Sequence, residues 1–367
     1  YINNDAKKTK GVKMIYGSVC SGVEAASLAW ESLGWQPAWF AEIEPFPTAV
    51  LNHHWPHVPN YVDMTKLEER ILIGEIEAPD ILVGGTPCQA FSVAGLRNSL
   101  ADDRGNLTLV LVRILNAIDE VRNRLGKQPA ILVWENVPGV LSTKDNAFGS
   151  FLAGLAGEEL PLEPAGKRWT SAGCVFGEQR NIAWRVLDAQ FFGVPQRRKR
   201  VFLVASAGNI SPAEILFERQ GESRGVAPSE SKEQNIAGFV EAGFGDFKRR
   251  NQAGTLKRTG GTIGGGSETL VVTVAATLTT GFGSRGVDAE QILNGNCVID
   301  YPEVRRLTPL ECERLQGFPD NHTRIPWRGK PAEECPDGPR YKACGNSMAV
   351  PCMRFIGQRI QGFLNRL

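Results

Sequence analysis

A cysteine in a glycine-rich loop is the residue best placed to do chemistry. Cys88 follows Pro87 in the run Gly-Gly-Thr-Pro-Cys-Gln, directly after an apolar stretch, residues 81–83, that is typical of a β-strand. Enzymes with α/β folds present nucleophiles in such loops, at the carboxyl edge of the sheet. Pro87 fixes its own φ and restricts Thr86, so the loop is stiff where the sulfur must be aimed. The pattern predicts a nucleophilic thiol, whereas a free cysteine taken alone is more often a small buried hydrophobe.

A glutamate at the end of an apolar run supplies a candidate acid. Glu135 follows residues 131–134, which predict a buried strand and end in Trp134. Partial burial would raise the pKa of the Glu135 carboxyl, which suits it to donate a proton to a ring nitrogen. A carboxylate that merely caps the following turn is the alternative at such a position.

Arginines precede another predicted strand. Residues 196–200 read Gln-Arg-Arg-Lys-Arg and lead straight into the apolar stretch 201–204. Side chains alternate along a strand, so Arg198 and Arg200 are predicted to point to one face. Two arginines at a strand edge can grip a phosphate or hydrogen-bond a base carbonyl, whereas an ordinary basic run is a solvated surface. A thiol, an acid and an arginine pair fit an electron-poor ring that needs covalent activation.

A turn of small residues and two acids are candidates for holding a cofactor. Residues 18–24 follow the first predicted strand and open a helix, so backbone N–H groups could approach a ligand there. Glu42, at the end of the second predicted strand, stands where such folds place an acid for ribose hydroxyls. Asp63 could lie at the edge of an adenine ring. Alone, the turn equally fits a plain strand–helix connection, and each acid fits a solvated surface carboxylate.

Length and composition bound the possibilities. The 367 residues have ordinary apolar and charged fractions, and the net charge of +1 gives no global argument for nucleic acid. Eight cysteines without regular spacing predict neither a disulfide framework nor a zinc site, so no metal is expected. The apolar runs are too short to cross a membrane, which together with free thiols predicts a cytoplasmic protein. The polar residues 1–12 are predicted to be a flexible tail.

Short β-like and helical stretches alternate along the first two hundred residues, the pattern of a parallel α/β sheet. The predicted elements are strand 14–19, helix 23–33, strand 38–41, helix 46–54, strand 81–83, helix 106–125, strand 130–133 and strand 201–205. Residues 206–304 are rich in Gly, Thr and Ser with short β-type runs, and helix returns at 309–315. The pattern predicts a catalytic domain of residues 13–205, completed by residues 305–367, with a module of residues 206–304 inserted between them.

In this order, these stretches resemble the DNA (cytosine-5) methyltransferases. The resemblance covers almost everything from Met14 to Pro351 apart from the inserted module. The matching stretches are SVCSGVE (18–24), Glu42, Asp63, GGTPCQAFS (84–92), DDRGNL (102–107), ENV (135–137), QRRKR (196–200), RRLTPLECERLQGFP (305–319) and GNSMAVP (345–351). The fold implied is a Rossmann-like class I methyltransferase domain with a mostly parallel sheet, plus a smaller β/loop-rich target-recognition domain at residues 206–304.

The resemblance also implies a mechanism, with S-adenosylmethionine as methyl donor, S-adenosylhomocysteine as product and no metal. Cys88, as thiolate, would add to C6 of a cytosine flipped out of duplex DNA. Glu135 would protonate or hydrogen-bond N3, and Arg198 and Arg200 would complete the catalytic set, with Arg200 on the O2 side. Addition across the 5,6 double bond makes C5 nucleophilic enough to take the methyl group.

Two groups of binding residues follow from the same resemblance. The implied cofactor residues are Ser18, Cys20, Ser21, Gly22, Glu42, Ile43, Asp63, Met64, Pro87, Asn346 and Ser347. The predicted DNA-binding residues are Gln89, Ser92, Gln196, Arg249, Arg250, Lys257 and Arg258. The last four lie in a basic segment of the inserted module, residues 248–258, which contains no acid. Ile43 stands where the family packs an aromatic or aliphatic side chain on adenine.

The implied partners are double-stranded DNA and a cognate restriction endonuclease, in the cytoplasm of a bacterium or a phage-infected cell. A monomer is expected, because one chain carries every catalytic part. Three alternatives are the same chemistry on RNA, as in the tRNA-directed relatives, a non-catalytic DNA-binding relative, and a nicotinamide-dependent oxidoreductase. The inserted module lacks the Cys-Phe-Thr tripeptide of the tRNA-directed branch. PCQ and ENV are intact, and an oxidoreductase would leave Cys88 and Glu135 unexplained.

Overall fold

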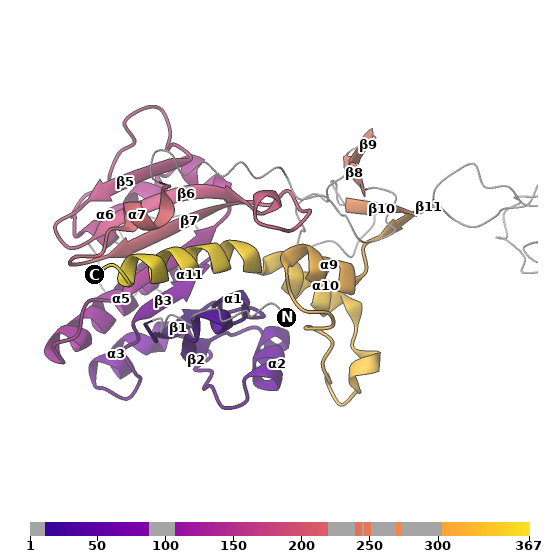
Figure 1. Ribbon diagram of the computed structural model, residues 1–367, viewed down its shortest axis with the longest axis horizontal. Coiled ribbons are helices and arrows are strands. Elements are labelled where there is room, and N and C mark those ends of the chain that lie inside the picture. The colour runs from indigo at the N-terminus through magenta and orange to yellow at the C-terminus, as the bar shows by residue number, and fades with distance from the viewer. Residues whose placement is uncertain (1–11, 88–106, 219–238, 244–245, 251–268, 274–302) are drawn as a thin grey trace, which may run out of the picture.

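A seven-stranded sheet with helices on both faces forms the larger part of the protein (Figure 1). The computed structural model describes residues 12–87, 107–218, 239–243, 246–250, 269–273 and 303–367, and the statements below refer to these. The strand order is β2-β1-β3-β4-β7-β6-β5. The strands are β1 (Ile15–Val19), β2 (Gln36–Ala41), β3 (Ile81–Gly84), β4 (Ile131–Asn136), β5 (Ala172–Phe176), β6 (Asn181–Asp188) and β7 (Lys199–Ser206).

The sheet is mixed, with a parallel half and an antiparallel half. β2, β1, β3 and β4 pair in parallel, whereas β4, β7, β6 and β5 pair antiparallel. The Rossmann-like class was predicted correctly, but the antiparallel edge formed by β5 and β6 was not predicted. β5 alternates between exposed and half-buried residues and contains no long apolar run, so its sequence gives little strand signal.

Burial on both faces explains the apolar runs of the central strands. Every residue of β3 and β4 is buried, as expected for strands covered by helices on both sides. Ile81 and Val83 point into one core cluster and Leu82 into the other, because side chains alternate along a strand. The helices α1 (Ala25–Trp30) and α11 (Val350–Leu364) contribute to the first cluster, and α5 (Leu107–Arg124) and α6 (Ala147–Ala156) to the second.

Short helices and turns join these elements. The predicted helix 23–33 is α1 followed by the 3-10 turn η1 (Glu31–Leu33), which Gly34 ends in a left-handed conformation with φ 73°. The other connecting elements are α2 (Pro45–His54), η2 (Met64–Lys66), α3 (Leu67–Leu72), η4 (Pro138–Ser142), η5 (Ala189–Phe191) and α7 (Pro212–Leu216). Within the described residues, no helix combines the length and apolarity that crossing a bilayer requires.

A second, four-stranded antiparallel sheet lies in the region of the inserted module. Its order is β11-β10-β8-β9. The strands are β8 (Phe239–Gly243), β9 (Asp246–Arg250), β10 (Thr269–Thr273) and β11 (Glu303–Arg306). α7 does not join this sheet: Ile215 and Leu216 are buried in the core of the larger sheet, where α7 contacts β6 and α11.

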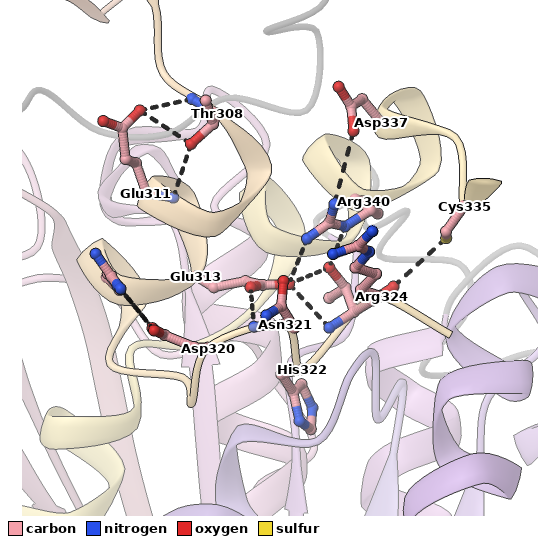
Figure 2. A network of polar contacts seen from close by, with 12 residues as sticks. Thr308, Glu311, Glu313, Asp320, Asn321, His322, Arg324, Cys335, Asp337 and Arg340 are labelled. Carbon is pink, nitrogen blue, oxygen red and sulfur yellow. Dashed lines mark hydrogen bonds and ion pairs between the residues drawn. The ribbon is translucent and has the colours of Figure 1, made fainter. Parts of the chain in front are cut away.

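The C-terminal segment forms a compact polar core around one glutamate (Figure 2). Its elements are α9 (Pro309–Gln316), η6 (Ala332–Glu334), α10 (Asp337–Asn346) and α11. Glu313 of α9 is fully buried and accepts hydrogen bonds from the backbone N–H of Asn321 at 2.8 Å and of Thr323 at 2.9 Å. It also accepts from the Thr323 hydroxyl and pairs with Arg340 of α10 at 3.2 Å. Glu313 thereby ties α9, the following loop and α10 together.

The same segment docks on the N-terminal strands and helices. His322, in the loop after α9, is hydrogen-bonded through Nε2 to the Val23 carbonyl at 2.8 Å and stacks on His54 of α2. The Trp30 indole donates to the Met353 carbonyl at 2.9 Å. α11 accordingly lies beside α1, although more than 300 residues separate Trp30 from Met353. This docking brings residues 345–347 to the carboxyl edge of the parallel strands.

Candidate active site

A pocket of about 1210 Å³ opens at the carboxyl edge of the parallel strands. Residues at or after the ends of β1, β2, β3 and β4 form one side of it, and residues from α10 form another. The predicted site residues that line the pocket are Cys20, Gly22, Glu42, Ile43, Asp63, Met64, Pro87, Glu135, Arg198, Arg200 and Asn346. Eleven positions scattered over the sequence are therefore brought to one cavity.

Glu135 and Arg200 form an ion pair at one end of the pocket. Arg200 Nε lies 3.1 Å from Glu135 Oε1, and the Glu135 side chain is 10% exposed. Among the described residues, no donor makes a hydrogen bond to that buried oxygen with proper geometry. Burial raises the pKa of the Glu135 carboxyl, while Arg200 and Arg198 act in the opposite direction. The net rise agrees with the predicted role of a proton donor.

Arg198 lines the pocket but is engaged with the backbone beneath it. Its Nη2 donates to the Gly345 carbonyl at 3.1 Å and to the Ser347 carbonyl at 2.6 Å. Burial lowers the pKa of the Arg198 guanidinium to about 9, and the charge of Arg200 adds to this effect. Arg198 therefore fastens residues 345–347 to β7, whereas Arg200 is the arginine that pairs with Glu135.

The root of the predicted cysteine loop is held by three hydrogen bonds to Thr86. Its Oγ1 shares a hydrogen bond with Thr108 of α5 at 2.9 Å and accepts from the Trp134 indole at 3.0 Å. Its carbonyl accepts from Asn136 Nδ2 at 2.9 Å. Asn136 thus anchors the peptide before Pro87, a role that sequence reasoning missed although Asn136 adjoins Glu135. Cys88, Gln89 and Ser92 lie outside the described residues.

Glycine at position 85 permits a close approach between this loop and the acid. A side-chain Cβ at Gly85 would lie 3.2 Å from the Glu135 carbonyl and 3.4 Å from Glu135 Oε2. It would also lie 3.3 Å from the Met348 methyl group. A larger residue in place of the second glycine of the Gly-Gly-Thr-Pro-Cys run would therefore have to displace β4 or the Met348 side chain slightly.

The other end of the pocket is built around Glu42. Its Oε2 accepts from the Gly22 N–H and its Oε1 from the Glu44 N–H, each at 2.8 Å. Burial is the main cause that raises the pKa of the Glu42 carboxyl. The pocket wall beside it carries two exposed apolar side chains, Ile43 at 68% and Val62 at 45%. Carboxylates beside open apolar side chains suit a nucleoside, whose ribose offers hydroxyls and whose base offers an apolar face.

Asp63, Cys20 and Met64 complete this end. Asp63 Oδ1 accepts from the backbone N–H of Thr65 at 3.0 Å and from its hydroxyl at 2.7 Å, which starts the turn η2. The Cys20 thiol lies 3.7 Å from the Met64 sulfur, and burial raises the pKa of Cys20 to about 12. Cys20 is therefore a neutral thiol here rather than a nucleophile.

Some predicted site residues lie elsewhere. Ser18, Ser21 and Ser347 do not line the pocket, since the Ser18 hydroxyl donates to Glu24, Ser21 donates to the Ser18 carbonyl, and Ser347 is buried. Gln196 needs a correction, because it was predicted to contact DNA but is fully buried in this structure. A turn at Val194, whose carbonyl accepts from the Gln196 N–H at 2.9 Å, sends the side chain inward.

Two of the four DNA-binding residues predicted in the inserted module belong to a strand. The backbone of Arg249 and Arg250 belongs to β9. Lys257 and Arg258 lie outside the described residues.

Sequence reasoning also missed a second wall of the pocket, contributed by residues 327–342. Trp327 packs edge-on against Phe46 of α2, with ring centroids 5.2 Å apart. Lys342 of α10 forms an ion pair with Glu44, the residue before α2, at 2.6 Å. Both contacts cross the pocket from the C-terminal segment to α2. Only the fold could reveal them, because nearly 300 residues separate the partners.

The pocket thus joins a carboxylate end that suits a nucleoside to an end that carries a buried acid and an arginine. The family model described as C-5 cytosine-specific DNA methylase matches residues 14–362. The chain therefore belongs to the C-5 cytosine-specific DNA methylase family. Cofactors of this family supply a methyl group, and the residues around Glu42 fit the nucleoside part of such a cofactor.

Two curated relatives extend this comparison. The chain is 42% identical over 460 residues to a protein of Escherichia phage P1 named DNA N-6-adenine-methyltransferase, covering 95% of this chain and 61% of that protein. It is 25% identical over 356 residues to the type II methyltransferase M.BsuFI of Bacillus subtilis, covering 96% of this chain and 74% of that protein. The chain thus spans about three fifths of the length of the phage protein.

Solved structures show the same fold. S. pombe Dnmt2 methyltransferase matches with a TM-score of 0.57 at 15% identity, over 96% of this chain and 99% of that chain. A putative DNA modification methyltransferase encoded within an E. coli prophage matches with a TM-score of 0.53 at 18% identity, over 96% of this chain and 99% of that chain.

Proposed function

We propose that this protein transfers a methyl group from S-adenosylmethionine to C5 of a cytosine flipped out of a specific duplex DNA sequence, through a covalent bond between Cys88 and C6. One observation carries the proposal: Glu135 is buried at one end of the pocket, paired with Arg200 and short of hydrogen-bond partners, while the Glu42 end suits a nucleoside. The family match supports the same chemistry.

The cofactor would lie along the Glu42 end of the pocket. Glu42 would accept hydrogen bonds from the ribose, Asp63 would face the edge of the adenine, and Ile43 would pack on its face. Cys20, Gly22, Met64, Pro87 and Asn346 line the same cavity, while Ser18, Ser21 and Ser347 would act through the backbone around it. When bound, S-adenosylmethionine supplies the methyl group that the cytosine accepts.

At the Glu135 end, the residues would activate the cytosine. The Cys88 thiolate forms a bond to C6, and the electron pair of the 5,6 double bond shifts to form a double bond between C4 and C5. The pair of the double bond between C4 and N3 moves to N3 and takes the proton that Glu135 delivers. Arg200 would hold O2 while its charge keeps Glu135 in place. After C5 has received the methyl group, loss of the C5 proton and of the Cys88 sulfur restores the double bond, and the proton on N3 returns to Glu135.

The hydrogen bonds around Thr86 would fix the position of the backbone from which the Cys88 loop starts. Asn136, Trp134 and Thr108 hold the residue two positions before Cys88, so the base of the loop is rigid. A rigid base under a reactive loop limits the conformational freedom lost when the loop meets its substrate. Asn136 would thus be a positioning residue for Cys88.

The inserted module, residues 206–304, would be the target-recognition domain. Arg249 and Arg250 of β9 would contact the DNA together with Lys257 and Arg258, and Gln89 and Ser92 would contact it from the cysteine loop. We further propose that residues 13–205 and 305–367 form one catalytic domain, which also includes α7, the helix that the predicted boundaries had assigned to the inserted module. A cognate restriction endonuclease, a cytoplasmic location and a monomeric state complete the proposal.

Methylation mapping tests the proposal. The chain and its variants Cys88→Ala and Cys174→Ala are expressed in a methylation-free bacterial host. Cys174 is an exposed free cysteine on β5, far along the sheet from the pocket, and serves as the matched control. Base-resolution mapping should find 5-methylcytosine in one short motif for the wild type and for Cys174→Ala, and none for Cys88→Ala. Methylation by Cys88→Ala would refute the covalent mechanism.

A second candidate is N6-adenine methylation, suggested by the name of the phage P1 relative. An exocyclic amine needs no addition across a ring double bond, so this reaction gives Cys88 and Glu135 no task. Nucleoside mass spectrometry on the same DNA separates the two products. N6-methyladenine without 5-methylcytosine would favour this candidate, and 5-methylcytosine in host tRNA alone would favour an RNA substrate.

A further inference from the structure

Asn60, a residue outside the predicted site, has every hydrogen-bonding group of its side chain engaged around Glu42. Its Oδ1 accepts from the Glu42 N–H at 2.9 Å and from the Val62 N–H at 3.1 Å. Its Nδ2 donates to the Glu42 carbonyl at 3.1 Å and to the Thr48 hydroxyl at 3.2 Å. An asparagine amide offers two acceptor sites and two donors, so its capacity is exhausted.

The backbone on both sides of Asn60 is joined to β2. The Phe40 N–H donates to the Pro59 carbonyl and the Tyr61 N–H to the Phe40 carbonyl, each at 2.8 Å. Asn60 and Phe40 form a parallel bridge. Residues 59–61 therefore lie beside β2 through one isolated bridge, and the Asn60 side chain extends this pairing past the end of β2 to Glu42.

The residue that follows Tyr61 is held in an unfavourable conformation. Val62 has φ 64°, in the left-handed region that β-branched residues rarely adopt, and the Asp63 N–H donates to the Tyr61 carbonyl at 2.7 Å across it. Strain of this kind persists where the surroundings impose it, and it concentrates at ligand sites. Here the turn leaves the Val62 side chain 45% exposed in the wall of the pocket.

We propose that Asn60 is a positioning residue that fixes the adenosine end of the cofactor pocket, and that Val62 forms an apolar wall against the adenine in addition to Ile43. The inference rests on the proposed function, since it assigns further residues to the same cofactor. Asn60 sets the distance between Glu42 and Asp63. Its side chain binds the backbone N–H and carbonyl of Glu42, and it also binds the N–H of Val62, in the turn just before Asp63.

The first test measures binding of S-adenosylhomocysteine by isothermal titration calorimetry to the wild type, Asn60→Ala and Asn52→Ala. Asn52 is an exposed residue of α2 and provides the same chemical change away from the pocket. Asn60→Ala should lose affinity by about tenfold or more, because it removes two hydrogen bonds to Glu42 and one each to Val62 and Thr48. Asn52→Ala should bind like the wild type. Equal affinity for Asn60→Ala and wild type would overturn the proposal.

Steady-state kinetics distinguish positioning from general damage. Asn60→Ala should raise the KM for S-adenosylmethionine while kcat at saturating cofactor stays within about threefold, as expected when binding alone is weakened. A fall in kcat with an unchanged KM would contradict the assignment. Asn60→Asp keeps the shape and the acceptors but loses both donors, so its affinity should fall as well; wild-type affinity in this variant would show that the donors are unnecessary.

Val62→Gly tests both the apolar wall and the backbone strain, because it should raise the melting temperature but lower the affinity for the cofactor product. Without cofactor, the variant should melt at a higher temperature than the wild type, because glycine adopts the left-handed conformation without strain. Its affinity for S-adenosylhomocysteine should nevertheless fall by about two- to tenfold, because an apolar contact is lost. Unchanged affinity would overturn the role of Val62. If the wild type itself bound no S-adenosylhomocysteine, the proposed function would fail first.

Discussion

Glu135 in the pocket and Glu313 in the C-terminal segment are both buried and both pair with an arginine, yet their surroundings differ. Glu313 accepts from two backbone N–H groups and one hydroxyl in addition to Arg340. Glu135 has Arg200 at 3.1 Å, and one of its buried oxygens has no hydrogen-bond partner among the described residues. Burial raises the pKa of the Glu135 carboxyl.

The difference separates a structural acid from a reactive one. A buried carboxylate whose lone pairs are filled by fixed donors is stable as an anion and holds its neighbours in place. A buried carboxylate with unfilled capacity is poorly stabilised as an anion, so it retains a proton more readily and can still accept a new partner. Glu313 therefore holds α9 and α10 together, whereas Glu135 keeps the capacity to accept a new partner, as its proposed role toward the cytosine ring requires.

Removing the reactive acid gives the largest expected effect on the reaction. Glu135→Gln should slow methyl transfer by about 10²- to 10⁴-fold, because the amide cannot deliver the proton to N3. Binding of S-adenosylhomocysteine and the free energy of unfolding should stay close to those of the wild type. Single-turnover transfer, calorimetry and urea unfolding provide the three readouts. A matching loss of cofactor binding would show that Glu135 is instead a folding residue.

Removing the structural acid Glu313 should lower the stability of the fold rather than act on the reaction directly. Glu313→Ala leaves the buried Arg340 with only the exposed Asp337 as ion-pair partner among the described residues and removes the acceptor of the Asn321 and Thr323 N–H groups, which should lower the free energy of unfolding by about 3–5 kcal/mol in urea titrations. Arg314→Ala, one position further along α9, breaks the exposed ion pair with Asp320 and is the control, with an expected change below about 1 kcal/mol. Equal costs for the two variants would contradict the structural role of Glu313.

Glu24 is a third buried acid, with more hydrogen bonds than Glu135 but without the arginine partner of Glu313. It accepts hydrogen bonds from Ser18 and Ser27, but it has no ion-pair partner among the described residues, and burial raises its pKa from 4.5 to about 7. The folded state therefore keeps a proton that the unfolded chain releases in this range. Stability from Glu24 should fall as pH rises from about 4.5 to about 7, at roughly 1.4 kcal/mol per unit of pKa shift.

His322 opposes this trend, because burial lowers its pKa from 6.5 to about 4. The unfolded chain takes up a proton that the folded state does not, so stability from His322 is lost as pH falls through this range. Urea unfolding between pH 4.5 and 7 checks both groups. Relative to the wild type, Glu24→Gln should gain stability as pH rises, and His322→Gln should lose it. Parallel pH profiles for all three proteins would refute both assignments.

The smallest expected effect comes from the start of α9, which carries Glu313. Thr308 and Glu311 form a reciprocal capping box, in which the Glu311 N–H donates to the Thr308 hydroxyl oxygen and the Thr308 N–H donates to Glu311. Thr308→Ala should lower the free energy of unfolding by about 1 kcal/mol, whereas Thr308→Ser should restore most of it. Urea titrations of both variants measure the difference, and an unchanged Thr308→Ala would show that Glu313 alone fixes this helix.

Local patterns in the sequence determined the elements of the parallel half and the main residues of the pocket. The apolar runs 81–83 and 131–134 predict strands because a strand that is covered by helices on both faces needs apolar side chains at every position. Glu42 and Glu135 could be found because each stands at the end of a parallel strand, and parallel strands bring their carboxyl ends to one edge. Arg200 reaches the same edge because it lies at the start of β7, which runs antiparallel to β4. These signals need only a few neighbouring residues.

Only the tertiary structure decided which polar groups are satisfied. Whether Asn60 holds Glu42, Asn136 holds Thr86 or His322 reaches Val23 depends on partners 18, 50 and 299 residues apart in the chain. Hydrogen bonds have strict distance and angle limits, and no local pattern in the sequence encodes those across such separations. For the same reason the inward turn of Gln196 and the saturation of Glu313 became visible only in the folded chain.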